Sequence, residues 1–225
     1  MKNLGKEKWL LALLWLGMVG NGTAAEETQT HFSPNDWECW MSDGGNPAEV
    51  FRWTKDGLNI HSTQTGWLVT KKEYCNFTLS FEIAYPTETF VDSGLTLRMG
   101  LPKRKNDPPS CIEVQLKSTD IGDLWGCCGY SICGKEGRRH SHREADTGDV
   151  YTCVPRQQIP SWNVGEWNRL DVTCRKNRIQ VRWNGETLNE GEEVENVSGR
   201  IGFQAKPYPQ GKGEIWIRRL ILTPE

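Results

Sequence analysis

Two consecutive segments of the chain, residues 94–99 and 112–116, alternate apolar and polar residues with the period of a β-strand. Side chains two positions apart on a strand share a face, so each segment would have one apolar and one polar face. An arginine, a carboxylate and an amide held on a rigid sheet suit the binding of a polyhydroxylated ligand. The simpler interpretation is an ordinary solvated sheet face. The polar faces would hold Thr96, Arg98, Glu113 and Gln115, and the apolar faces Leu95, Leu97, Met99, Ile112, Val114 and Leu116.

Short segments with strand character recur along most of the chain, and none shows a sustained helical period. In residues 77–84, for example, Leu79, Phe81 and Ile83 alternate with polar residues. This pattern predicts an all-β chain in which two antiparallel sheets pack as a β-sandwich, with polar outer faces and a groove where an outer face curves. The expected strands cover residues 51–54, 58–61, 66–70, 77–84, 94–99, 112–116, 167–174, 178–183, 199–204 and 214–222.

The N-terminal residues have the pattern of an export signal. Lys2, Lys6 and Lys8 precede an apolar run over residues 9–19, and small residues for cleavage follow at 23–25. We therefore expect residues 1–25 to be a signal peptide, residues 26–225 to form one domain, and the protein to be secreted or periplasmic. The apolar run is shorter than the about 20 residues that a membrane span requires, and no cysteine follows it closely enough for lipid attachment, so no membrane anchor is expected.

The eight cysteines all follow the proposed signal peptide, and an even number in an exported chain favours disulfides. Cys127, Cys128, Cys133 and Cys153 bracket a region of about 126–160 with little strand character, where we expect a disulfide-rich loop insertion. The sequence does not determine which cysteines pair. A metal site that combines three of these cysteines with His140 and His142 is disfavoured, because the spacing is not that of a tetrahedral zinc site. No metal or other cofactor is expected.

The net charge and the aromatic residues indicate which kinds of ligand the protein can bind. The formal net charge is −2 at pH 7, and the basic clusters at 103–105 and 138–140 lack interleaved aromatic residues, so no nucleic acid is expected. The chain has 11 tryptophans, most of which we assign to the core because tryptophan is a large apolar residue. Trp67 and Trp125, each beside a glycine, are the candidates for stacking on a sugar ring.

A series of short motifs follows in a recognisable order along the domain. They include Gly66-Trp67-Leu68-Val69, Asp92-Ser93-Gly94-Leu95, Glu113-Val114-Gln115-Leu116, Trp183-Asn184-Gly185 and Gly199-Arg200-Ile201-Gly202. The series resembles the 3-keto-disaccharide hydrolase family over about residues 37–222. The resemblance implies a concanavalin A-like, or laminarinase-like, jelly roll that acts on oxidised glycosides in bacterial sugar degradation. A glycoside or oligosaccharide is then the expected ligand.

The chemistry of a 3-keto-glycoside suggests roles for the polar residues. A ketone at C3 acidifies the hydrogen on C2 and leaves the C1 substituent β to the resulting enolate, so a base can expel the aglycone before water adds back. We expect Glu113 to be the base and Arg98 to stabilise the enolate or a sugar oxygen. Gln115, Asp92 and Thr96 would bind the substrate together with the two tryptophans.

Two departures from the family pattern bear on these roles. Several members have a histidine where this chain has Val181, so a mechanism that needs that histidine is not expected here. Members usually have an asparagine at the position of Asp92.

Other functions remain open at the level of sequence. Direct glycosidic hydrolysis needs two flanking carboxylates, for which Glu113 would pair with Glu82, Asp120 or Asp123. A non-catalytic, lectin-like carbohydrate-binding module would bind glycans and release nothing, and an adhesive or structural protein would have scattered groove residues. An endo-glucanase of the laminarinase type is disfavoured, because Gln115 stands where its signature needs an acid.

Overall fold

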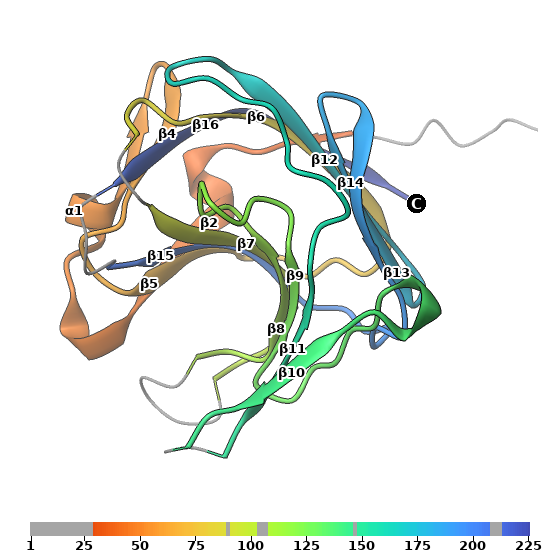
Figure 1. Ribbon diagram of the computed structural model, residues 1–225. Coiled ribbons are helices and arrows are strands. Elements are labelled where there is room, and N and C mark those ends of the chain that lie inside the picture. Colours follow the sequence, from red (N-terminus) through yellow and green to blue (C-terminus); the bar gives the residue numbers. More distant parts are fainter. Residues whose placement is uncertain (1–28, 89–90, 103–107, 146–147, 208–212) are drawn as a thin grey trace, which may run out of the picture.

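A computed structural model describes residues 29–88, 91–102, 108–145, 148–207 and 213–225. The proposed signal peptide lies outside these ranges. Two antiparallel eight-stranded sheets pack face to face (Figure 1), so the prediction of an all-β sandwich is confirmed. Within the described ranges, the one α-helix is α1 (Pro47–Val50), and no helix is long and apolar enough to cross a membrane.

Sheet A has the strand order β14-β13-β12-β6-β16-β4-β3, with β1 also paired to β16. Its strands are β1 (Thr30–His31), β3 (Phe51–Thr54), β4 (Gly57–His61), β6 (Phe77–Ala84), β12 (Asn168–Arg175), β13 (Arg178–Trp183), β14 (Glu186–Gly191) and β16 (Glu214–Pro224). Sheet B has the order β10-β11-β9-β8-β7-β15-β5-β2. Its strands are β2 (Trp37–Met41), β5 (Gly66–Thr70), β7 (Asp92–Met99), β8 (Cys111–Gln115), β9 (Leu124–Cys127), β10 (His140–Arg143), β11 (Val150–Val154) and β15 (Arg200–Lys206).

The core lies between the inner faces of the two sheets, as the alternation of apolar residues predicts. Leu79 and Phe81 of β6 share one buried cluster with Leu95 of β7 and Phe203 of β15. The rings of Phe81 and Phe203 meet edge to face across the sandwich, with their centroids 5.6 Å apart. All ten strands expected from the sequence are present, and their ends differ from the expected ones by at most two residues.

The region expected to be a disulfide-rich loop is instead part of sheet B. Strands β10 and β11 pair with each other, and β11 pairs with β9, so they extend the sheet to its edge. All eight cysteines are free thiols, and the expected disulfide framework is therefore not supported. The sequence did not reveal β10 because its four residues are polar and exposed on both faces, which leaves no alternation to detect.

A β-bulge in β7 changes the face on which residues after Leu97 lie. Thr96 pairs with Gly202 and Met99 with Arg200, so two residues of β7 stand opposite one residue of β15. At the bulge, Arg98 adopts a left-handed conformation, with φ of 50°. Met99 consequently shares a face with Thr96, whose hydroxyl donates to its sulfur at 3.3 Å. The predicted alternation therefore fails after Leu97, and Met99 leaves the main core for a second cluster on the outer face of sheet B.

The prediction that Arg98 faces a ligand groove is wrong. Its side chain is fully buried, and the guanidinium donates through Nε and Nη2 to the carbonyl oxygen of Cys75, at 3.3 and 3.2 Å. It also donates to the carbonyl oxygen of Glu195. Arg98 thus satisfies backbone acceptors of two loops, which is a structural role.

We expect Arg98→Leu to lower the free energy of unfolding by about 3 kcal/mol, because it removes a buried guanidinium and leaves the carbonyl oxygens of Cys75 and Glu195 without these donors. Urea denaturation measures this change. The matched control is Arg182→Leu, because Arg182 also donates to a backbone carbonyl, that of Gly185, but is exposed. The control should change stability by less than about 0.5 kcal/mol. Equal losses in the two variants would contradict the structural role of Arg98.

Candidate functional site

A pocket of about 430 Å³ opens over the outer face of sheet B. Figure 1 shows how this sheet curves between β5 and β10, and residues of β5, β7, β8, β9, β10, β11 and β15 line the pocket. The sequence-predicted site residues that line it are Asp92, Glu113, Gln115, Trp67 and Trp125. Arg98 and Thr96 are not among the lining residues. The lining residues that the sequence analysis did not propose for a sugar site include Lys117, His142, Glu144, Tyr151, Gln204 and Lys206.

The register of neighbouring strands brings these side chains together. Residues opposite each other in an antiparallel pair project from the same face of the sheet. Glu113 in β8 stands between Thr96 in β7 and Trp125 in β9. Other opposed pairs on this face include Asp92 with Lys206, Gly94 with Gln115, Gly94 with Gln204, Trp67 with Gln204, and Cys111 with Cys127.

Glu113 is the carboxyl group at the centre of this arrangement. Its side chain lies in the pocket lining, but the residue is only 8% exposed. Burial, followed by the negative charge of Asp92, raises the pKa of Glu113 to about 7, although the charge of Lys206 and a hydrogen bond from Cys127 act in the opposite direction. A carboxyl group with this pKa exchanges its proton near neutral pH, which suits a general acid or base.

Two cysteine thiols lie beside Glu113 in the pocket. The Sγ atom of Cys127 is 3.9 Å from Oε2 of Glu113 and donates to it. A hydrogen bond with Cys111, together with burial, raises the pKa of the Cys127 thiol well above its usual value, so the thiol stays protonated as a donor. In the described part of the chain, no three histidine, cysteine or acidic side chains are arranged to hold a metal ion.

The side-chain oxygen of Gln115 is already engaged by backbone donors. Oε1 accepts hydrogen bonds from the backbone nitrogens of Leu116 and Lys117, both at 3.0 Å. These bonds hold the amide at the end of β8, where Gln115 lines the pocket. The amide nitrogen, a donor, is therefore the group that can meet an oxygen of a ligand.

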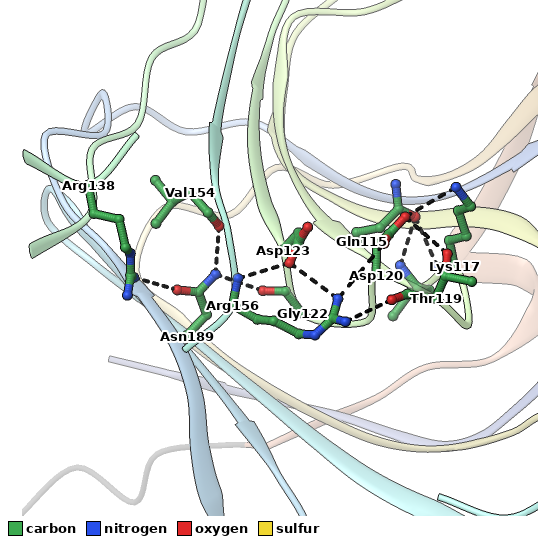
Figure 2. A network of polar contacts seen from close by, with 11 residues as sticks. Gln115, Lys117, Thr119, Asp120, Gly122, Asp123, Arg138, Val154, Arg156 and Asn189 are labelled. Carbon is green, nitrogen blue, oxygen red and sulfur yellow. Dashed lines mark hydrogen bonds and ion pairs between the residues drawn. The ribbon is translucent and has the colours of Figure 1, made fainter. Parts of the chain in front are cut away.

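A polar network holds the loop that follows β8 (Figure 2). Arg156 donates through Nη2 to the carbonyl oxygen of Thr119 at 2.8 Å, and its backbone nitrogen donates to Asp123 at 2.9 Å. In the same loop, Nζ of Lys117 lies 3.1 Å from the carboxylate of Asp120. Lys117 and Asp120 both line the pocket, whereas Arg156 is not among the lining residues. By its bonds to Thr119 and Asp123, Arg156 holds the loop that forms this wall of the pocket.

The network continues from this loop into sheet A. Asn189 of β14, which is fully buried, donates to the carbonyl oxygens of Gly122 at 2.9 Å and Val154 at 2.8 Å. Its own side-chain oxygen accepts from Arg138 at 3.0 Å. Figure 2 shows these contacts as one continuous chain of polar groups, which ties the pocket loop to the edge of the other sheet.

The three carboxylates considered as partners of Glu113 have different positions. Glu82 lies on β6 of sheet A, where Arg218 and Arg219 each donate to it at 2.6 Å, so it is not in the pocket. Asp123 accepts from Arg156. Asp120 lines the pocket, paired with Lys117. Asp92 also lines the pocket, and burial raises its pKa while Lys206 and Lys117 lower it.

The aromatic residues form the less polar part of the lining. Trp67 is 5% exposed and belongs to the outer cluster of sheet B with Val69 and Met99, so it is largely part of the floor. Trp125 is half-buried, and its indole nitrogen has no hydrogen-bond partner among the described residues. Tyr151 of β11 also lines the pocket, and its hydroxyl lies 3.2 Å from the sulfur of Cys128.

The match to a family model indicates a carbohydrate-active, glycosidase-like domain. The chain belongs to the family of 3-keto-alpha-glucoside-1,2-lyase-like domains, whose model matches residues 26–222. This match confirms the resemblance seen in the sequence motifs. No curated protein matches the sequence.

Solved structures confirm the jelly-roll fold. A protein of Parabacteroides distasonis ATCC 8503, named as a candidate glycosyl hydrolase, is 19% identical, with a TM-score of 0.58 over 88% of this chain and 100% of its own. The carbohydrate-binding module CBM66 from Bacillus subtilis is 9% identical, with a TM-score of 0.55 over 84% of this chain and 95% of its own. The Bacillus licheniformis β-glucanase is 8% identical, with a TM-score of 0.55 over 87% of this chain and 94% of its own. At these identities the likeness shows the fold alone.

The raised pKa of Glu113 has a consequence for stability. Because the pKa of about 7 in the folded state exceeds the value of 4.5 for the free side chain, the folded protein binds this proton more tightly than the unfolded chain does. The resulting stabilisation is complete below the unfolded pKa and is lost as the pH rises through the folded pKa.

Glu113→Gln should therefore be more stable than the parent protein by about 3 kcal/mol at about pH 9, and nearly equal to it at about pH 4. Urea denaturation over this pH range measures the difference. The control Glu186→Gln, at the exposed first residue of β14, should follow the parent protein at every pH. A difference between Glu113→Gln and the parent that does not grow with pH would contradict the proton linkage.

Proposed function

We propose that the protein cleaves glycosides whose sugar is oxidised to a ketone at C3, by elimination followed by hydration, with Glu113 as the base. The observation that supports this most directly is a carboxyl group in the pocket lining whose pKa burial raises to about 7. The family supplies the class of substrate. Elimination needs one such group, which can take a proton and later return it.

The reaction balances without a further reactant except water. The base takes the hydrogen from C2, the electron pair of that bond forms the C1–C2 double bond or the enolate, and the bond from C1 to the aglycone oxygen breaks. The departing oxygen is protonated, and water then adds across the double bond at C1 and C2. Glu113 in its protonated form can supply a proton in these later steps.

A cation or donor must stabilise the developing enolate oxygen, and Arg98 is too deeply engaged with backbone to do so. Lys206 is the better candidate. It lies in the pocket lining directly opposite Asp92, and its charge reaches Glu113. The amide nitrogen of Gln115 supplies a neutral donor in the same pocket. Both residues belong to strands of the sheet, so their backbone positions are set before substrate binds.

The rest of the lining suits a sugar and its aglycone. Trp125 and Tyr151 offer aromatic surfaces for the apolar faces of the ligand, and Asp92 and Gln204 offer hydrogen-bond partners for its hydroxyl groups. Direct hydrolysis by two carboxylates is less well supported, because Glu82 is remote, Asp123 is bound to Arg156 and Asp120 is paired with Lys117.

We also propose that the protein is exported and acts outside the cytoplasm. The charged and apolar pattern of residues 1–25 supports this location. The match to the family begins at residue 26, directly after the proposed cleavage site. A glycoside-cleaving domain of about 200 residues would then start close to the new N-terminus.

We expect the protein to release the aglycone from an aryl 3-keto-glucoside, and Glu113→Gln to lower kcat about a thousandfold because the base is lost. Binding of the substrate should persist, because glutamine keeps the shape of the side chain. Spectroscopic detection of the released phenol measures the rate, and calorimetry with the variant measures binding.

Glu186→Gln serves as the control and should keep full activity. Full activity of Glu113→Gln would remove Glu113 from the mechanism. Binding of glycans by the parent protein without release of any product from the 3-keto-glucoside or the unoxidised glucoside would support the lectin-like module instead.

A further inference from the structure

The carboxylate of Glu113 occupies the space over a glycine on the neighbouring strand. Gly94 lies on the outer face of β7, two residues from Thr96, the direct partner of Glu113. A Cβ atom placed on Gly94 would lie 2.0 Å from Oε1, 2.5 Å from Cδ and 2.6 Å from Cγ of Glu113. These separations are far below van der Waals contact, so no other residue fits at position 94 with Glu113 in its present place.

The backbone does not itself require glycine at this position. Gly94 is not among the glycines with positive φ, and it lies within a regular paired stretch of β7. Glycine inside a strand costs stability relative to residues with side chains, and it often marks a close approach by another group. Here the group that approaches is the carboxylate of Glu113.

The two oxygens of Glu113 are held on opposite sides. Oε1 lies over Gly94 of β7, and Oε2 accepts from the thiol of Cys127 in β9. The side chain therefore lies in a recess between the strands that flank β8, and this recess accounts for its low exposure. Loss of the recess on the β7 side would move the carboxylate toward the open pocket.

We propose that Gly94 is a positioning residue, whose missing side chain forms the recess that holds the carboxylate of Glu113 in its buried, reactive position. The expected effect on catalysis rests on the proposed function, whereas the geometry of the recess is independent of it. A methyl group at position 94 displaces the end of the Glu113 side chain, which is flexible, rather than the strand. The displaced carboxylate gains solvent, its pKa falls toward the ordinary value, and it no longer stands where the substrate proton is expected.

The experiment compares Gly94→Ala with Gly100→Ala. Gly100 directly follows the same strand, and a Cβ there would meet only the carbonyl oxygen of Ser110, at the ordinary distance of 3.8 Å. Carbon-13 NMR of glutamate carboxyls, with the Glu113 signal assigned from Glu113→Gln, follows the titration of Glu113 without any substrate. We expect Gly94→Ala to lower the pKa of Glu113 by at least one unit and Gly100→Ala to leave it unchanged.

Kinetics with the 3-keto-glucoside supply the second readout. Gly94→Ala should lower kcat by ten- to a hundredfold with a smaller change in KM, and should move the acidic limb of the pH profile of kcat to lower pH. Gly100→Ala should match the parent protein in both. Retention of both the Glu113 titration and kcat in Gly94→Ala would overturn the proposal.

A double-mutant cycle keeps the proposal testable if Gly94→Ala folds poorly. In the Glu113→Ala background the recess is empty, so addition of Gly94→Ala should no longer lower the melting temperature. An equal loss in both backgrounds would show that position 94 acts through the backbone, which would also overturn the proposal. A shifted Glu113 titration in Gly94→Ala, combined with a parent protein that cleaves no 3-keto-glucoside, would uphold the positioning role and reject the proposed function.

Discussion

The pocket depends on the alignment of three neighbouring strands, β7, β8 and β9, on the outer face of sheet B. Their apolar residues on the inner face are fixed by the core between the sheets, and a shift of one residue would reverse every side chain. The same packing therefore determines which residues reach the pocket. Glu113 stands between its neighbours on two strands because Ile112 and Val114 are held in the core.

Burial of a carboxyl group in a folded protein is costly. Among the described residues, Glu113 is the buried acidic residue. Glu113 has a thiol as its hydrogen-bond donor and no arginine or lysine in direct contact among the described residues, unlike Glu82 on the opposite sheet. The charge of Lys206 reaches it only as a weaker influence than burial. Sites whose polar groups are poorly stabilised inside an otherwise well-packed fold are frequently functional, because the reactive state needs that environment.

The sequence predicted the sandwich because alternation of apolar and polar residues along a strand indicates which face of the strand is buried. It also placed Glu113 and Gln115 on one face, since β8 pairs with both of its neighbours without a bulge. It failed for Arg98 because the bulge in β7 leaves no mark in the alternation, and for Lys206 because the expected strand ended two residues too early. His142 and Tyr151 were missed with β10 and β11. Strand β10 is exposed on both faces, and β11 begins with two partly buried residues and ends with three buried ones, so neither strand shows an alternation. The burial that raises the pKa of Glu113 arises from contacts between strands, which a single sequence does not reveal.

Strand β10 also has a consequence for the behaviour of the protein at high concentration. It is the last described strand at one end of sheet B, so one side of its backbone has no neighbouring strand. An open strand edge is a template for pairing with a second molecule and for aggregation. Here the edge consists of His140, Ser141, His142 and Arg143, all exposed, and it is short. Hydrated side chains and the cationic Arg143 along this edge disfavour the docking of another strand, so the hairpin that extends the sheet beside the pocket also protects its edge.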